Sequence, residues 1–376
     1  MKGSKGERMK FIKGVDLSTL KEVETCGGRF FDEGNEQDVI DILKKYDINS
    51  VRLRLWNLPF TKEGIPYGAG CNDLSTTVEL AKRCLSRDMG FLLDFHYSDF
   101  WADPGKQNIP KQWQGLDEGQ LEKAVYQYTL DIMKTLKQVN AYPTMVQIGN
   151  EITNGLLWPY GKVPNYDTIA KFVNAGIRAV RSMDKEIPIM IHLDNGGNNA
   201  LYREWFDNFM LRGEDFQIIG LSFYPFWHGT LDDLSNNMKD IAKRYGKELV
   251  IAEVSMGYTM EDYADYEKLQ PSERKGMATK PELLKNLDYS MTQKGQADFM
   301  QDIMNRLREV PDGLGRGFYY WEPAWIPVPG SGWATNEALQ YTGEAGLLGN
   351  EWANQALFDY NGNALPSLRV ICDWQE

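Results

Sequence analysis

The segment at residues 145–151, MVQIGNE, carries the pattern that decides the fold: a short β-branched apolar run that ends in the polar pair Asn150 and Glu151. A second segment, ELVIAEVS at residues 248–255, has the same character and carries Glu253 near its end. Apolar runs of about four to eight residues followed by loop-like sequence are typical of buried strands in a parallel sheet. The two segments therefore predict strands that bring two glutamates to one edge of a sheet.

Runs of this kind occur eight times. They begin at Phe11 (FIKGVDLS), Ser50 (SVRLRLW), Gly90 (GFLLDFHYS), Met145 (MVQIGNE), Pro188 (PIMIHLDN), Ile218 (IIGLSFYP), Glu248 (ELVIAEVS) and Gly317 (GFYYWEPA). Between them, as at residues 39–46 and 121–136, apolar residues recur with the three- and four-residue spacing of amphipathic helices. Eight such units predict an α/β fold, the closed (β/α)8 TIM barrel. A doubly wound open sheet is the alternative, but no run opens into a GxGxxG turn.

The 376 residues suit one barrel with elaborated loops, and no stretch has the composition of an interdomain linker. We expect a single domain at residues 11–376, after a polar N-terminal extension at residues 1–10. Two long loops are expected, Met256–Lys294 after the seventh strand and Ala324–Glu351 after the eighth. Loops of this length are usually functional or mobile.

The formal net charge of -12 argues against a nucleic-acid or anionic-membrane partner, because such surfaces bind basic patches. No apolar stretch approaches the roughly 20 residues of a membrane-spanning helix, and the polar start lacks the apolar core of a signal peptide. Aromatic residues are abundant, at 12% with 11 Trp and 19 Tyr. We therefore expect a neutral partner that is recognised by flat rings.

The paired glutamates suggest a sugar hydrolase. One carboxylic acid would protonate the leaving oxygen, while the other carboxylate would meet the developing oxocarbenium charge. Asn150, next to Glu151, can donate to the substrate hydroxyl beside the reacting carbon. Tyr224, which ends the sixth run, can hold the nucleophile through its phenol, although a tyrosine of the core is the alternative.

All three histidines fall at the carboxyl end of a predicted strand, which is where active sites of such barrels form: His96, His192 and His228. We expect them to hydrogen-bond sugar hydroxyls or the two glutamates, and a structural role for each is the alternative. A metal-dependent hydrolase with Asp94 or Asp194 as further ligands is less favoured, because no strand carries an HxH pair.

The alternating segment VRLRLW points Arg52 and Arg54 to one face of its strand, the inside of the barrel, and Val51, Leu53 and Leu55 to the other. A buried arginine needs a charged partner. A carboxylate that must stay ionised for catalysis is one such partner. A purely structural ion pair with Asp16 or Asp94 is the alternative.

Most of the tryptophans follow predicted strand ends, which places them on one rim of the barrel. They are Trp56, Trp101, Trp113, Trp158, Trp227, Trp321, Trp325 and Trp333. Aromatic faces stack on the C–H faces of pyranose rings, so several in one cleft would indicate an oligosaccharide site. Of these, Trp101, Trp227 and Trp321 are predicted substrate contacts.

With these residues in place, the chain resembles glycoside hydrolase family 53, the endo-β-1,4-galactanases that cut the galactan side chains of pectin. The resemblance runs almost end to end and rests on KGVDLSTL, VRLRLWN, LLDFHYSDFWADPGKQ, VQIGNEITNGLLWP, IHLDNGG, LSFYPFWHG, AEVSMGYT, YYWEPAW and NQALFD. It implies a retaining mechanism with Glu151 as acid/base and Glu253 as nucleophile, the latter kept ionised by Arg54. Val254 departs from the small hydroxyl residue expected after the nucleophile.

The resemblance also implies partners and setting. The expected ligands are β-1,4-galactan and galacto-oligosaccharides, acted on by a monomer outside the cell or on a microbial surface, since the polymer cannot enter. No cofactor is expected. Bacterial members can carry structural calcium in a long loop, and Glu261, Asp262, Asp265 and Glu267 lie in the first long loop without a recognisable calcium spacing. A β-mannanase or β-glucanase of the same clan and a non-catalytic carbohydrate-binding barrel are the alternatives.

Overall fold

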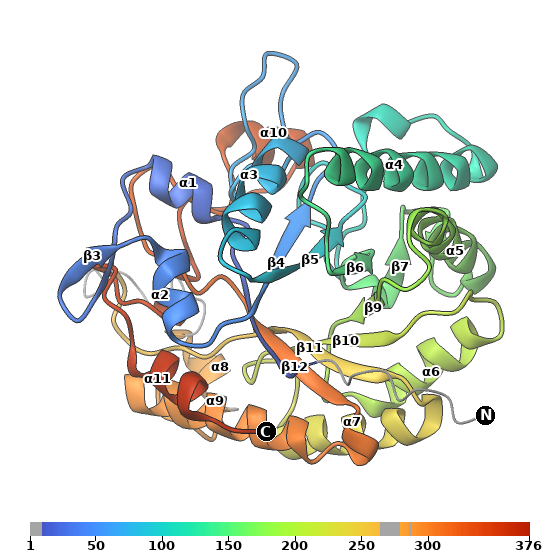
Figure 1. The fold of residues 1–376 in the computed structure, drawn as a ribbon. Coiled ribbons are helices and arrows are strands. Elements are labelled where there is room, and N and C mark those ends of the chain that lie inside the picture. The colour runs from blue at the N-terminus through green and yellow to red at the C-terminus, as the bar shows by residue number, and fades with distance from the viewer. Residues whose placement is uncertain (1–9, 264–278, 286) are drawn as a thin grey trace.

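The computed structural model describes residues 10–263, 279–285 and 287–376. Its centre is a closed barrel of eight parallel strands that follow one another around the ring in chain order (Figure 1). The strands are β1 (Ile12–Asp16), β4 (Ser50–Leu55), β5 (Gly90–Phe95), β6 (Met145–Ile148), β9 (Ile189–Leu193), β10 (Ile218–Phe223), β11 (Glu248–Val254) and β12 (Gly315–Tyr320). Because β1 pairs with both β4 and β12, the ring closes, and the predicted (β/α)8 barrel is confirmed.

Seven of the eight predicted apolar runs contain one whole barrel strand, and the eighth overlaps its strand. The clearest difference is at β12, which begins at Gly315 rather than at the predicted Gly317. Gly315 and Arg316 do not belong to the apolar pattern, yet both are buried. The strand extends to Gly315 because this residue pairs with Leu249 on β11. Such pairing between strands cannot be predicted from the local sequence.

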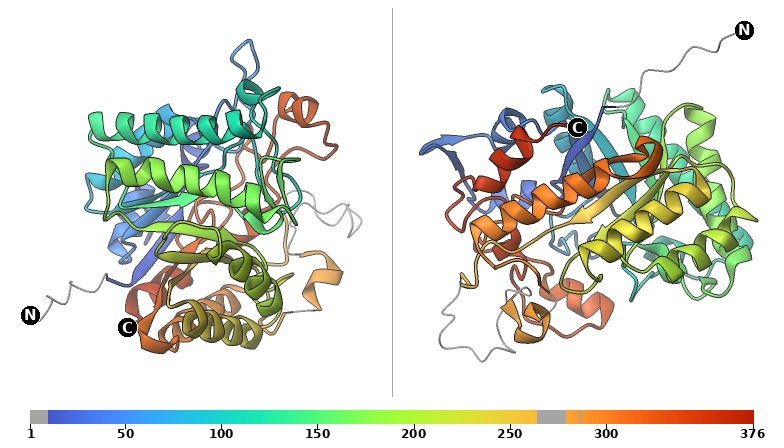
Figure 2. Two further views of the ribbon diagram at one scale, coloured as in Figure 1. Left: turned by 90° about the vertical axis from the view of Figure 1, so that its right-hand side faces the viewer. Right: turned by 90° about the horizontal axis from the view of Figure 1, so that it is seen from below.

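Helices surround the barrel on its outside (Figure 2). They are α1 (Leu20–Thr25), α2 (Val39–Lys45), α3 (Leu74–Leu85), α4 (Glu118–Gln138), α5 (Tyr166–Met183), α6 (Asn199–Met210), α7 (Leu231–Tyr245), α8 (Pro281–Leu284), α9 (Gln293–Arg308), α10 (Asn336–Thr342) and α11 (Pro366–Asp373). The expected outer helices at 39–46 and 121–136 are α2 and α4. Several begin at a side chain that accepts a backbone N–H, as Asp117 does for α4, a cap worth about 1 kcal/mol. In the described part of the chain, no helix combines the length and apolarity needed to cross a membrane.

Two small hairpins lie outside the barrel sheet: β2 (Phe30–Asp32) with β3 (Asn35–Gln37), and β7 (Gly155–Leu156) with β8 (Gly161–Lys162). The long loops expected after the last two strands are present. The first carries the short helix α8 and the second carries α10. Of the acidic residues considered for calcium, Asp265 and Glu267 lie outside the described residues, as does the extension before Lys10.

The barrel interior has an apolar layer and a polar layer. The apolar layer consists of Ile12, Leu92, Met145, Met190, Ile218, Val250, Ala252 and Tyr319. Two residues further along three of these strands, on the same inward face, stand Asp94, Gln147 and His192. On β4 the alternation is as predicted, since Val51, Leu53 and Leu55 join the outer core. The polar groups therefore gather at the carboxyl end of the barrel.

Candidate active site

Glu151 and Glu253 meet at the carboxyl end of the barrel. Glu253 lies in β11, and Glu151 follows β6 in a left-handed conformation with φ of 46° that turns the chain out of the strand. One carboxylate oxygen of each glutamate and one ring nitrogen of His192 lie within 4.8 Å of one another. Both glutamates line the same cavity, so their carboxylates face a common space.

The Glu253 carboxylate is held at both oxygens. Arg52 donates from Nη1 to Oε1 at 2.9 Å, and the Tyr224 hydroxyl donates to Oε2 at 2.8 Å. Tyr224 directly follows β10, and the phenolic bond expected of it is present. The Arg52 guanidinium also bonds Asp16 at 2.9 Å and Asp94 at 2.7 Å. Both partners that the sequence left open for this arginine, the nucleophile and the structural aspartates, are thus engaged at once.

The pairing expected between Arg54 and Glu253 is wrong. Arg54 donates to Glu322, just after β12, at 2.6 Å and to the carbonyl of Ala69 at 3.0 Å. Its guanidinium lies 4.3 Å from the centre of the Trp101 ring. Arg54 is two residues nearer the end of β4 than Arg52, so it passes above the nucleophile and supports the cavity wall instead.

Glu151 and Glu253 are both buried, but the surroundings of Glu151 are more negative. Its Oε1 accepts a hydrogen bond of 2.5 Å from the Ser222 hydroxyl on β10. Burial and the nearby carboxylates of Glu253 and Asp194 raise the pKa of Glu151 well above its usual range. Burial raises the pKa of Glu253 too, but Arg52 and Tyr224 hold that increase back. The arrangement favours a protonated Glu151 beside an ionised Glu253.

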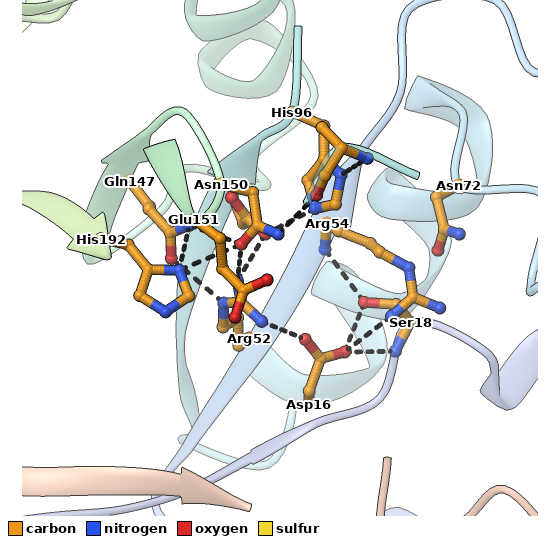
Figure 3. A network of polar contacts seen from close by, with 12 residues as sticks. Asp16, Ser18, Arg52, Arg54, Asn72, His96, Gln147, Asn150, Glu151 and His192 are labelled. Carbon is orange, nitrogen blue, oxygen red and sulfur yellow. Dashed lines mark hydrogen bonds and ion pairs between the residues drawn. The ribbon is translucent and has the colours of Figure 1, made fainter. Parts of the chain in front are cut away.

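Asn150 is fixed by a polar network beneath the cavity (Figure 3). Its Oδ1 accepts from Arg52 Nη2 at 2.7 Å, and its Nδ2 donates to the Ala102 carbonyl at 2.9 Å. Gln147 on β6 accepts from Arg52 Nε at 3.1 Å, which ties the same arginine to the strand that carries Glu151. Within the described residues, one N–H of the Asn150 amide has no acceptor, because an amide carries two hydrogens and Ala102 takes one.

Among the described residues, none of the histidines bonds either glutamate directly. His96 accepts at Nδ1 from Trp56 at 3.2 Å, while its Nε2 faces Asp94 at 3.0 Å. His192 reaches Glu151 only through Ser222, 2.9 Å from its Nε2. His228 Nδ1 lies 3.2 Å from the amide nitrogen of Tyr224, and burial lowers the pKa of His228 to about 4. Of the three, His96 lines the cavity.

The cavity above the carboxylates has a volume of about 370 Å³ and strongly aromatic walls. Its aromatic lining consists of Trp101, Tyr224, Trp321, Trp325, Trp333 and Trp352. The Trp321 and Trp352 rings meet edge to face with centroids 4.7 Å apart. Trp352, which the sequence did not single out, belongs to the long segment after β12 and follows no strand end, so its position gave no signal.

The remaining predicted tryptophans lie elsewhere. Trp56 and Trp113 are buried packing residues, and Trp158 lies under Lys162, whose Nζ is 4.2 Å from the ring centre. Trp227 is 40% exposed beside Trp352 at the edge of the cavity, with ring centroids 6.1 Å apart. Asp194 is not part of the lining: its carboxylate accepts from Thr153 and Asn195 and acts on Glu151 through its charge.

Among the residues that the structure describes, Glu151, His192 and Glu253 are the group spaced closely enough to hold a metal ion. Both ring nitrogens of His192 are already hydrogen-bonded, to Ser222 on one side and to the Gln147 and Asn150 amides on the other. A metal would have to break these bonds, so the set suits a metal poorly. The four cysteines, Cys26, Cys71, Cys84 and Cys372, are free thiols.

Comparison with known proteins connects this geometry to a family. A model of glycosyl hydrolase family 53 matches residues 12–371. The chain is 43% identical over 370 residues to an uncharacterized protein in the bgaB 5′ region of Niallia circulans, covering 96% of this chain and 93% of that protein. It is 36% identical over 390 residues to the endo-β-1,4-galactanase of Bacillus subtilis, covering 99% and 87%.

Solved structures give the same result. The catalytic domain of an Ignisphaera aggregans GH53 protein is similar with a TM-score of 0.88 and 40% identity, over 98% of this chain and 97% of that one. A fungal β-1,4-galactanase is similar with a TM-score of 0.78 and 30% identity, over 97% and 100%. The barrel of this chain is therefore a glycoside hydrolase barrel.

Proposed function

The chain belongs to glycosyl hydrolase family 53, and we propose that it is an endo-β-1,4-galactanase that hydrolyses internal bonds of pectic galactan with retention of configuration. The observation that carries the proposal is the approach of the two carboxylates, with oxygens within 4.8 Å beneath an aromatic cavity. Carboxyl groups of retaining glycosidases lie about 5–5.5 Å apart, whereas inverting enzymes leave about 6.5–9.5 Å for a water.

Glu253 is the proposed nucleophile. Its carboxylate attacks the anomeric carbon and forms a glycosyl ester as the glycosidic bond breaks. The bonds from Arg52 and Tyr224 keep it ionised and fix its orientation, so little reorganisation is needed for the attack. Arg52 also pairs with Asp16 and Asp94, so its positive charge is shared among three carboxylates. The charge of Glu253 is therefore only partly neutralised, and the carboxylate stays nucleophilic.

Glu151 is the proposed acid and base. In the first step it donates its proton to the departing oxygen, for which its raised pKa prepares it. Once Glu253 is an ester its negative charge is gone, so the pKa of Glu151 falls. Glu151 can then take a proton from water, which attacks the anomeric carbon and releases Glu253.

The surrounding residues fit a polymeric sugar. The free N–H of Asn150 is placed to bond the hydroxyl next to the reacting carbon, where the bond strengthens as charge develops. Trp101, Trp321 and Trp352 offer ring faces for galactose units on the cavity walls, and Trp227 extends that surface outward. An extracellular or cell-surface location, a monomeric state and catalysis without a cofactor are part of this proposal.

The test compares linear β-1,4-galactan, cellulose and β-mannan side by side, following reducing ends and product sizes. We expect short galacto-oligosaccharides from galactan only, with the β-anomer released first as seen by proton NMR. The Glu151→Gln and Glu253→Gln variants should each lose this activity, whereas Glu204→Gln on the exposed face of α6 should keep it. Equal cleavage of another polymer, no cleavage of galactan, or initial release of the α-anomer would overturn the proposal.

A further inference from the structure

Ser222 is the side chain that touches the proposed acid/base from behind the cavity. Its hydroxyl lies 2.5 Å from Oε1 of Glu151 and 2.9 Å from Nε2 of His192, and both Ser222 and His192 are fully buried. Within the described residues, this hydroxyl is the one hydrogen-bond donor to the Glu151 carboxyl group. Neither residue lines the cavity, so neither is placed to touch substrate.

Counting protons fixes the direction of these bonds. A serine hydroxyl has one hydrogen, so when Ser222 donates to an ionised Glu151 it cannot also donate to His192. His192 must then donate its Nε2–H to Ser222. Burial and the charge of Arg52 lower the pKa of His192 far below its usual value, so the ring is neutral and its Nδ1 is bare.

The Gln147 amide can donate a hydrogen bond to the bare Nδ1 of His192. Gln147 Nε2 lies 3.1 Å from it, and the orientation of that amide is set because its Oε1 accepts from Arg52 at 3.1 Å. Asn150 Oδ1, an acceptor, also lies 3.0 Å from Nδ1, so this direction is fixed only while Ser222 donates to an ionised Glu151. In that state the donors run from Arg52 to Gln147 to His192 to Ser222 to Glu151, because Arg52 cannot give up its protons. Figure 3 shows Gln147, Arg52 and His192 converging behind Glu151.

We propose that Ser222 and His192 are positioning residues that direct a hydrogen bond onto Oε1 of the ionised Glu151, and so stabilise the carboxylate that acts as base in the second step. The inference rests on the proposed role of Glu151. The other charged groups that face Glu151 are the carboxylates of Glu253 on β11, Asp194 after β9 and Asp103 after β5, none of which donates when ionised. Without the directed hydroxyl, the ionised Glu151 carboxylate would have no hydrogen-bond donor among the described residues.

The test is the pH profile of kcat/KM for Ser222→Ala on galactan. Ser222 stabilises the ionised form of Glu151, so its loss should raise the pKa of Glu151 and move the alkaline limb upward by about one pH unit. We expect kcat/KM at the optimum to fall about tenfold, less than the roughly 10²–10⁴-fold contribution of acid–base catalysis itself. On an activated dinitrophenyl galactobioside, whose leaving group needs no proton, the fall should be under about twofold.

The controls separate positioning from folding. Ser235→Ala removes another buried serine, on α7 and outside the cavity lining, and should leave both the limb and the rate unchanged. Should Ser222→Ala fail to fold, His192→Gln, which retains an amide donor toward Ser222, should keep the wild-type limb, and His192→Leu should move it upward. An unmoved alkaline limb in Ser222→Ala, or in His192→Leu, overturns the inference. Failure of the wild-type protein to cleave galactan would instead overturn the proposed function.

Discussion

At the scale of single residues, the site gives two carboxyl groups of the same chemical kind different proton affinities. Glu253 has a cation and a phenol within hydrogen-bond distance, whereas Glu151 has one hydroxyl and faces other carboxylates. Both are at least nine-tenths shielded from solvent. The difference between an acid and a nucleophile therefore lies in which donors each receives, because burial acts on both alike.

The Glu151 carboxyl should cost the protein stability at neutral pH. Its pKa is raised in the folded state, so the folded protein holds this proton more tightly than the unfolded chain does. The resulting contribution to stability is fully present below the ordinary pKa of about 4.5, and it is lost as the pH rises through the folded-state pKa. Glu151→Gln should therefore melt at a higher temperature than wild type at pH 7, by about 1–2 °C, with a smaller difference near pH 4. Thermal unfolding of both proteins across this range is the measurement, and a difference that does not change with pH would contradict it.

Removing the charge of the nucleophile should lower the pKa of the acid. Glu253→Gln takes away the negative charge that, after burial, contributes most to the raised pKa of Glu151. We expect the Glu151 titration, followed by carbon-13 NMR of labelled glutamate, to move to lower pH in this variant. The same substitution at exposed Glu204 is the control and should leave the titration in place.

At the scale of elements, β4 supplies the cation on which the interior depends. Arg52 bonds groups from β1, β5, β6 and β11 and from the turn after β6, and its side chain is 1% exposed. A buried ion network of this kind is not a net gain over apolar packing, but losing one member leaves the other charges uncompensated. The arginine thus ties five neighbouring parts of the barrel to one geometry.

Arg52→Lys should therefore be severe despite the conserved charge. A lysine offers three donors from one point and cannot reach the five acceptors that the planar guanidinium bridges. We expect a loss of about 3–5 kcal/mol in the free energy of unfolding, measured by urea denaturation, together with loss of activity. Arg244→Lys, at an exposed pair with Asp207 on the outer helices, should leave the midpoint where it is. Matching midpoints for the two variants would show that the network is not stabilising.

The sequence was sufficient to predict the eight barrel strands and to place Glu151 and Glu253 at the same end of the barrel, since apolar runs and their polar ends are local features. The sequence was not sufficient to predict which interior side chains pair, because that depends on their height along the barrel axis. Arg52 and Arg54 share one face of β4, and only the stagger of neighbouring strands decides which of them meets Glu253. Ser222 and Gln147 were missed for a related reason, because each is one polar residue within an apolar strand and its partner lies on another strand.

At the scale of the whole molecule, the cavity is a composite of loops from opposite parts of the chain. Trp101 after β5 donates from Nε1 to the carbonyl of Trp333, after β12, at 2.9 Å. Glu22 on α1 accepts from the backbone amides of Gly70, after β4, and Gly332, after β12, at 3.1 and 3.2 Å, which ties two further segments to the one after β12. The aromatic walls are therefore held by contacts between loops as well as by the barrel below them.

Truncating an aromatic wall should weaken binding more than chemistry. Trp321→Ala removes a ring that lines the cavity and packs on Trp352, so we expect KM for galactan to rise about tenfold, with a smaller change in kcat, as a stacked ring is worth roughly 1–1.5 kcal/mol. Initial rates over a range of galactan concentrations give both constants. Tyr126→Ala on α4, outside the cavity, is the matched control. An effect confined to kcat would mean that Trp321 positions the carboxylates instead.

Arg52 also has a consequence for how the protein is made. The nascent chain presents this arginine early, but Glu253 lies 201 residues further on. At a synthesis rate of about 5–20 residues per second, Glu253, the third carboxylate partner, is added roughly 10–40 s after Arg52. Strand β12, which closes the ring beside β1, is added later still. Until then a half-built barrel exposes a charged interior and two open sheet edges to the cytosol or to a chaperone. The pairing of Arg52 with Glu253, which makes the finished site rigid, is thus not available to the growing polypeptide. The barrel can therefore be completed only after nearly the whole chain has been translated.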